Sequence, residues 1–300
     1  MSVAKERVLE LAKKHGLEVK ENSLTFNESG LDFLAVFAED QEGENWVLRI
    51  PRREDVVTGT LKEKKTLDLI APFISVQVPN WSIFTNELIG YKQLSGIPAG
   101  TIDHTARAYI WELDEKNVPD LFNETLARAM VSLHAIARQA MNAKWLTVQN
   151  AEEARSSMKE KMDNVKAEFG VSSELWERWQ AWVTEDSFWP KQTGLVHGDL
   201  HAGHILIDKE TARVTGFIDW TEASVTDIAN DFVPHYRTFG DEALERLIYH
   251  YEKAGGYVWP KMKEHVIELT ATYPIAIAEF ALKSGLGEYK NMAKQVLGVE

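Results

Sequence analysis

The sequence predicts an α+β protein with two lobes: a smaller N-terminal lobe built on an antiparallel sheet and a larger, mainly helical C-terminal lobe. Three observations support this prediction. Strand-like runs separated by polar turns dominate the first part of the chain, the glycine- and proline-rich segment 95–100 interrupts that pattern, and apolar residues then recur at helical spacing. We therefore expect the N-terminal lobe at residues 1–95, a hinge at about 91–98 and the C-terminal lobe at residues 99–300.

Each element of the N-terminal lobe follows from the spacing of its apolar residues. Apolar side chains at every third or fourth position among charges predict helices at residues 3–16 and 60–70. Short apolar runs that end at polar turns or at proline predict extended segments. These segments are residues 31–38, 46–50, 74–78, 82–84 and 88–94.

In the C-terminal lobe, helical spacing extends over residues 126–137 and 152–183. Three tryptophans between residues 176 and 182 form a stripe that resembles a ligand-binding face. Because a spacing of three residues covers one side of a helix, core packing is the better interpretation of this stripe. A compact β segment at residues 193–220 follows, and helices are expected from there to residue 300.

The composition excludes several functional classes. The 46 Asp and Glu residues outnumber the 33 Lys and Arg residues, and the resulting formal charge of −13 argues against a general nucleic-acid binder. The absence of cysteine excludes disulfides, thiolate metal sites and cysteine nucleophiles. No apolar run is long enough to span a membrane, and the charged N-terminal segment lacks the apolar core of a signal peptide. We expect a cytoplasmic protein that binds neither nucleic acid nor membrane and is, by default, a monomer.

Two short stretches carry the side chains from which a catalytic site could be built. Residues 193–208, with the sequence TGLVHGDLHAGHILID, predict a strand, a tight turn at His197–Asp199 and a second strand. Residues 214–218 predict a third strand that ends just before Asp219. Asp199, His204 and Asp219 are therefore expected at the ends of neighbouring strands, where they can converge on one point.

Each of these three side chains has a chemical use at such a point. A carboxylate on a turn can accept the proton of an alcohol and orient the alcohol for attack. A histidine and an aspartate together can bind a divalent cation, and phosphoryl transfer needs both functions. Alone, His-Gly-Asp is a common turn and Ile-Asp-Trp is an ordinary strand end. Their combination in this order favours a phosphoryl-transfer site that uses Mg²⁺.

The two stretches resemble a known signature. His197-Gly-Asp199, the ligand position five residues later and Ile218-Asp219-Trp220 are similar to the catalytic motif of the aminoglycoside-phosphotransferase and protein-kinase-like superfamily. The resemblance implies a two-lobed protein-kinase-like fold, with Asp199 as the catalytic aspartate and Asp219 as the principal Mg²⁺ ligand. The superfamily usually has asparagine where this chain has His204, whereas the macrolide 2′-phosphotransferases have histidine there. Further stretches that resemble the macrolide 2′-phosphotransferases are residues 27–33, 46–55, 98–104, 201–204 and 259–265.

The resemblance also implies a nucleotide site in the N-terminal lobe. The turn that contains Ser29 and Gly30 takes the place of a phosphate-covering loop, although it has no GxGxxG pattern. Arg49 stands where kinases have a lysine, and Glu63 is its expected ion-pair partner unless Glu63 belongs to a solvated helix face. The base is expected against the backbone of the interlobe strand. That strand contributes Tyr91, Lys92 and Leu94.

The cofactors follow from the resemblance alone. Members of this family commonly accept GTP and often prefer it, so the resemblance implies GTP as the phosphoryl donor, with ATP as the alternative, and Mg²⁺ as the metal.

A macrolide acceptor is a large apolar ring that bears an amino sugar, so its pocket should be broad, apolar and aromatic, with a carboxylate near the dimethylammonium group. Residues after position 230 offer candidates, and each of them also has an ordinary structural role open to it. Asp231 is an example, because a comparable acid in the superfamily tethers the catalytic turn through backbone N–H groups. The candidates are Asp231, Tyr236, Tyr273, Glu279 and Phe280, together with Asp199.

These observations predict a macrolide 2′-O-phosphotransferase, which moves the γ-phosphoryl group of GTP or ATP to the 2′-hydroxyl of the amino sugar and so inactivates the antibiotic. Two alternatives stay open. The first is a kinase for another small molecule, such as an aminoglycoside or a sugar, which a polar, acid-lined acceptor cleft would favour. The second is a catalytically dead kinase-like binding module, for which Arg49 and His204 leave room although Asp199 and Asp219 are intact.

Overall fold

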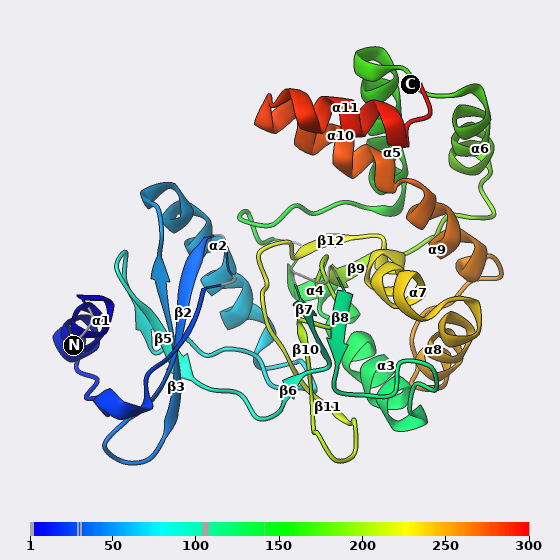
Figure 1. Cartoon of the computed structure of the whole chain (residues 1–300). Helices are drawn as coiled ribbons and strands as arrows, with labels where there is room; N and C mark the ends of the chain where they lie inside the picture. Colours follow the sequence, from blue (N-terminus) through cyan, green and yellow to red (C-terminus); the bar gives the residue numbers. More distant parts are fainter. Residues whose placement is uncertain (1–2, 29, 31, 104–107, 141, 300) are drawn as a thin grey trace.

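The computed structural model describes residues 3–28, 30, 32–103, 108–140 and 142–299. Its N-terminal region contains a five-stranded antiparallel sheet with the strand order β1-β2-β3-β5-β4 (Figure 1). The strands are β1 (Thr25–Asn27), β2 (Phe33–Glu39), β3 (Asn45–Pro51), β4 (Ile83–Phe84) and β5 (Ile89–Lys92). The predicted segment at residues 74–78 is the exception, because it leaves this sheet and Gln77 instead pairs with Gly216 near the C-terminal strands.

The two faces of this sheet bury alternate side chains, as the period of a strand requires. Leu48 and Ile50 pack in a cluster with Val8 of helix α1 (Val3–Lys14). Val47 packs in the main core with Leu67 of helix α2 (Glu54–Ile70), so the two helices cover opposite faces of the sheet (Figure 1). Strand β3 thus contributes side chains to both faces of the sheet, and a hydrophobic cluster lies on each face.

Helix α2 begins at Glu54, six residues before the predicted start at residue 60. Gly59 and the β-branched residues before it weaken the helical signal, so the sequence pattern alone missed the first turns. Glu54 and Asp55 lie in the first turn, where carboxylates interact favourably with the helix dipole. The buried face of α2 begins at Thr60 and includes Glu63, so the missed first turns add no buried residue to it.

The C-terminal region is mainly helical and contains three small ladders of strands. Strands β6 (Ile97–Pro98), β10 (Ile205–Ile207) and β11 (Val214–Phe217) form one sheet, β7 (Gly100–Asp103) and β8 (Ala108–Trp111) form a hairpin, and β9 (Gly194–Val196) pairs with β12 (Ser224–Thr226). The helices of this region are α3 (Asp120–His134), α4 (Ala137–Ala140), α5 (Ala151–Phe169), α6 (Ser173–Thr184), the 3₁₀ helix η2 (Ile228–Phe232), α7 (Val233–Phe239), α8 (Asp241–Lys253), α9 (Met262–Ala271), α10 (Tyr273–Ser284) and α11 (Gly287–Val296).

Two features differ from the sequence-based expectation. Residues 97–98 lie in the C-terminal sheet as β6, so only residues 93–96 lie between the two sheets within the predicted hinge at 91–98. The strand before the turn His197–Asp199, β9, pairs with β12 and not with β10 or β11. Residues 224–226 carry too short an apolar run to be recognised as a strand. The turn is therefore held by a ladder that local patterns did not reveal.

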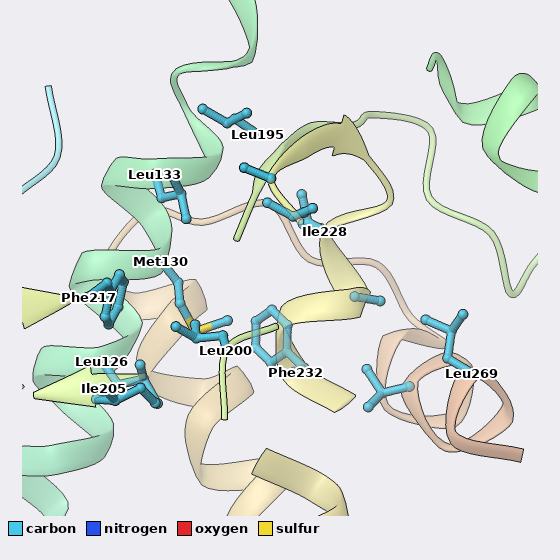
Figure 2. Close-up of a cluster of buried hydrophobic side chains, with 14 of the residues drawn as sticks. Leu126, Met130, Leu133, Leu195, Leu200, Ile205, Phe217, Ile228, Phe232 and Leu269 are labelled. Carbon is cyan, nitrogen blue, oxygen red and sulfur yellow. The ribbon is translucent and has the colours of Figure 1, made fainter. Parts of the chain in front are cut away.

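The main core lies where α3 meets the strands around the turn His197–Asp199. Figure 2 shows Met130 and Leu133 of α3 among side chains that include Phe217 and Phe232. The tryptophan stripe of α6 belongs to the same core, since Trp179 and Trp182 are almost fully buried, as the spacing predicted. The N-terminal sheet followed by a mainly helical region confirms the predicted α+β class.

No helix in the described part of the chain is both long enough and apolar enough to cross a membrane.

Candidate active site

The turn His197–Asp199 follows β9 and is shaped by Gly198. Gly198 has φ of 86°, a backbone conformation that side chains other than glycine rarely adopt. A Cβ atom at this position would also lie 2.6 Å from the carbonyl oxygen of Glu222. Glycine is therefore needed both for the turn itself and for its close approach to the loop after Asp219.

Asp231 anchors this turn from η2. Its Oδ2 accepts a hydrogen bond from the His197 N–H at 2.9 Å, and its Oδ1 accepts one from the Gly198 N–H at 2.9 Å. Burial by itself would raise the pKa of Asp231, but hydrogen bonds from His134 and the turn lower it, so the carboxylate stays charged. The Asp231 side chain has no solvent-exposed area, which favours the tethering interpretation of this residue over a contact with substrate.

His197 joins the turn to the strand that precedes Asp219. Its buried ring lies with Nε2 3.0 Å from the Ile218 carbonyl oxygen, and its Nδ1 accepts the Asp199 N–H at 3.3 Å. This pair of contacts assigns the ring proton to Nε2, and burial lowers the pKa of His197, so the ring is neutral. The His197 side chain thus connects the backbone at Asp199 with the backbone at Ile218 through hydrogen bonds.

Asp199 itself is free to act on a ligand. Half of its side chain is exposed, and its Oδ2 lies 3.5 Å from His204 Nδ1 and 3.9 Å from His201 Nε2, distances too long for strong hydrogen bonds. Its lone pairs can therefore accept a proton from an alcohol placed at the turn.

His204 and Asp219 form the best candidate metal site among the described residues. The His204 Nδ1–H donates to the Asp199 carbonyl oxygen at 2.8 Å, which leaves the Nε2 lone pair 3.7 Å from Asp219 Oδ2. A divalent cation between these two atoms would meet one imidazole nitrogen and one carboxylate oxygen, so the donors fit a single metal ion.

Asp219 is held in an unusual conformation that suits this role. Its φ is 64°, which is uncommon for a residue with a side chain, and the Thr221 hydroxyl donates to its Oδ1 at 2.8 Å. Although burial opposes ionisation, His204, Thr221 and Arg49 lower the pKa of Asp219 overall. The carboxylate is therefore ionised and oriented before any ligand arrives.

His201 is an alternative metal ligand, because Asp199, His201 and His204 offer ligand atoms within 4.8 Å of one another. Its Nδ1, however, already accepts the Gly203 N–H at 3.0 Å, and Tyr109 lies 3.3 Å from the same nitrogen. Burial lowers the pKa of His201 to about 4, so the ring is neutral and Nε2 carries its proton toward Asp199. His201 supports the turn, and Asp219 remains the better partner of His204.

In the N-terminal region, Arg49 of β3 and Glu63 of α2 form the ion pair that the sequence predicts. The Nη1 and Oε1 atoms are 2.9 Å apart, and only 3% of the Glu63 side chain is exposed. The guanidinium also lies over the Phe33 ring, 4.2 Å from its centroid. Burial raises the pKa of Glu63, and the charge of Arg49 opposes this rise. Loss of either side chain would therefore leave the other as an unpaired charge in a buried position.

The other predicted nucleotide residues are placed as follows. Ser29 lies outside the described residues, while Gly30 packs tightly enough that a Cβ there would lie 2.8 Å from the Phe33 carbonyl oxygen. Tyr91 is buried in the core, and Lys92 forms an exposed ion pair with Glu44. Leu94 is half-buried in the connection between the sheets. Contacts of these residues with a nucleotide stay predictions. The contacts with the base would be made by backbone N–H and C=O groups.

A cleft of about 320 Å³ lies beside the turn His197–Asp199 and has Gly198 in its lining. It runs from the turn to α5, and its lining is more polar than expected for a macrolide pocket. The lining includes Ser157, Met158, Lys161, Gly198, Glu222, Asp227 and Asn230.

None of the predicted acceptor residues after position 230 lines this cleft. Tyr273 and Phe280 are half-exposed on α10, Tyr236 is half-buried on α7, and Glu279 reaches the cleft only indirectly, through its ion pair with Lys161 at 3.3 Å. These acceptor contacts stay predictions that this geometry does not favour.

Sequence reasoning missed Glu222. It is an exposed carboxylate on the cleft wall, and its only sequence signal is that it lies three residues after Asp219.

Comparison with known proteins gives consistent matches. Residues 23–265 match the phosphotransferase enzyme family known as APH. The chain is 44% identical over 292 residues to the uncharacterized protein YcbJ of Bacillus subtilis, covering 97% of this chain and 95% of that one.

Three solved structures carry the comparison further. The apoenzyme of macrolide 2′-phosphotransferase MphH from Brachybacterium faecium is similar with a TM-score of 0.91 and 33% identity, over 97% of each chain. A type I macrolide 2′-phosphotransferase has a TM-score of 0.85 and 37% identity, over 99% of this chain and 97% of that one. A GDP complex of aminoglycoside 2′-phosphotransferase-IIIa has a TM-score of 0.73 at 17% identity, over 99% and 98%, and shows the fold alone. These similarities confirm the predicted kinase-like fold.

Proposed function

The chain belongs to the phosphotransferase enzyme family and is a small-molecule phosphotransferase, and on this premise we propose that it is a macrolide 2′-phosphotransferase. One observation carries the finer proposal. Similarity to two macrolide 2′-phosphotransferases, at 33% and 37% identity, runs over nearly the whole chain. The sequence resemblance, in which His204 stands where the superfamily usually has asparagine, supports the same proposal. The product would carry added bulk and negative charge on the sugar and would no longer fit its target.

In the proposed reaction, Asp199 orients the 2′-hydroxyl and accepts its proton. The hydroxyl oxygen forms a bond to the γ-phosphorus while the bond from that phosphorus to the β–γ bridging oxygen breaks, and the nucleoside diphosphate leaves. His204 and Asp219 would hold Mg²⁺, which when bound supplies positive charge to the phosphate oxygens. Asp231 keeps Asp199 in place throughout because it fixes the backbone of the turn.

Arg49 would contact the phosphates of the donor, with Glu63 fixing the direction of its guanidinium. The backbone of the interlobe strand that contributes Tyr91, Lys92 and Leu94 would read the edge of the base. We propose GTP as the donor, on family resemblance, with ATP as the alternative.

Mass spectrometry of erythromycin after incubation with the purified protein, Mg²⁺ and either GTP or ATP tests this proposal. We expect the macrolide to gain the mass of one phosphate, faster with GTP than with ATP. The protein without Mg²⁺ is the control and should give no product. No gain for several macrolides, with nucleotide bound, would remove the macrolide proposal. Nucleotide binding without transfer to any alcohol would favour a catalytically dead binding module.

An aminoglycoside acceptor is the second candidate, because the cleft lining is polar and includes Glu222 and Asp227. A polycation would interact favourably with these carboxylates, whereas Lys161 in the same cleft opposes it. The same mass measurement with kanamycin in place of erythromycin separates the two acceptors. We expect phosphate on the macrolide only.

Glu222 is the carboxylate we assign to the ammonium group of the amino sugar, because it lines the cleft beside Gly198. Asp227, the other cleft carboxylate, is engaged by His265 at 2.6 Å. We expect Glu222→Gln to raise KM for erythromycin about tenfold, with kcat changed little, because one charge-assisted contact is lost.

Steady-state kinetics check the Glu222 prediction. Glu210→Gln, on an exposed turn away from the cleft, is the matched control and should behave like the wild type. A macrolide that lacks the amine should bind both proteins equally. An unchanged KM for erythromycin would place its ammonium group elsewhere.

A further inference from the structure

A series of buried hydrogen bonds extends from the catalytic turn through Asp231 into the core. His134 of α3 lies with Nε2 3.1 Å from Asp231 Oδ2. Its other ring nitrogen, Nδ1, lies 2.7 Å from the hydroxyl of Tyr251 on α8. Only 5% of the His134 side chain is exposed, and Tyr251 is 1% exposed, so water cannot replace either contact.

The direction of each hydrogen bond follows from the acceptor at its end. The ionised Asp231 carboxylate only accepts, so His134 Nε2 carries the proton and donates to it. With that proton on Nε2, Nδ1 is the acceptor for the Tyr251 O–H. Asp231 Oδ2 therefore receives the His134 N–H and the His197 N–H together, while Oδ1 receives the Gly198 N–H. Each N–H and O–H donor in this series of hydrogen bonds therefore has one acceptor.

Two glycines make room for this arrangement. A Cβ at Gly194, the first residue of β9, would lie 2.9 Å from the His134 Cβ and 2.5 Å from Ile228. A Cβ at Gly256 would lie 2.2 Å from the Tyr251 ring. The backbone thus approaches both side chains more closely than any other residue type would allow, which fixes the two rings in position.

We propose that His134 and Tyr251 are positioning residues for phosphoryl transfer, which orient the Asp231 carboxylate and through it hold the catalytic turn in the geometry that Asp199 needs. The Tyr251 hydroxyl fixes the His134 ring, and the His134 N–H fixes the oxygen of Asp231 that binds the turn. The expected effect on turnover rests on the proposed function, whereas the expected effect on the turn does not.

Tyr251→Phe tests this proposal because it removes one oxygen and leaves the buried ring. In the full-length protein without ligands, we expect amide hydrogen exchange at His197 and Gly198 to accelerate about tenfold, while exchange in α5 and α6 stays unchanged. In the macrolide assay, we expect kcat to fall about tenfold with KM within twofold of the wild type, as for residues that orient ligands through a second layer of hydrogen bonds. Tyr249→Phe, on the same helix and 58% exposed, is the matched control and should change neither quantity.

His134 supplies an independent test of the same series of hydrogen bonds. His134→Gln keeps an N–H that can reach Asp231, whereas His134→Leu removes every polar atom. We expect protection of the Gly198 amide to decrease from the wild type to His134→Gln and further to His134→Leu, with kcat following the same order.

Two results would overturn the proposal. One is an equal acceleration of exchange in every helix, which would mean that Tyr251 contributes only general stability. The other is an unchanged exchange rate at His197 and Gly198. If the wild type phosphorylates no macrolide, the exchange measurement still decides this inference, so its failure and that of the proposed function are distinguishable.

Discussion

Replacing Asp199 with asparagine is expected to lower kcat by about 10³-fold, within the range that a positioned general base contributes. Asparagine has nearly the same shape and can still accept a hydrogen bond, but it cannot take up the proton of the attacking hydroxyl. The Asp199 carboxylate makes no strong hydrogen bond within the described part of the chain, so its loss should leave the turn intact. KM for the nucleotide and the melting temperature should therefore stay close to the wild type.

Single-turnover kinetics with saturating nucleotide and macrolide measure this effect, since they separate the chemical step from product release. Asp120→Asn is a suitable control, because Asp120 is 76% exposed at the start of α3 and lies outside the proposed site. Retained turnover in a folded Asp199→Asn protein would remove the assigned role of Asp199.

The part of the fold that was predicted correctly is the part whose signal is local. Strands β2 and β3 have alternate residues on opposite buried faces, so a short window of sequence contains the whole pattern. The pairing of β9 with β12 was missed because it joins residues far apart in the chain, and three residues of β12 carry little pattern of their own. The start of α2 was missed because its first turns contain residues with weak helical preference.

The candidate site was likewise predicted only where the signal in the sequence is local. Asp199, His204 and Asp219 were found from a signature whose residue order reflects the strands that carry them, and the structure brings them together. The acceptor contacts were sought among residues after position 230, three of them on α10, yet the cleft beside the turn is lined by α5 and by the loop after Asp219. Which helix faces the turn depends on long-range packing of α5 against α10, and no local pattern encodes it.

Asp219→Asn is the second substitution with a large expected effect, because it removes the negative charge proposed to hold Mg²⁺. We expect kcat/KM to fall about 10³-fold at low Mg²⁺ concentration and to recover partly as Mg²⁺ is raised, since a neutral amide oxygen is a weaker ligand than a carboxylate. The fall should be steep because the other side of the candidate site offers only one imidazole nitrogen, His204 Nε2, 3.7 Å from Asp219 Oδ2. Titration of activity with Mg²⁺, together with macrolide binding measured without nucleotide, checks this result.

His204 provides the matched comparison. His204→Asn introduces the ligand that the wider superfamily usually has, and it should retain more activity than His204→Ala at every Mg²⁺ concentration. In His204→Asn the hydrogen bond from the ring to the Asp199 carbonyl oxygen is lost, so some decrease in kcat is expected even when metal is saturating. If Asp219→Asn and the wild type showed the same Mg²⁺ dependence, the metal would have to bind elsewhere, and Asp199 with His201 and His204 would become the next candidate. The difference between the two His204 variants therefore separates loss of a metal ligand from loss of support for the catalytic turn.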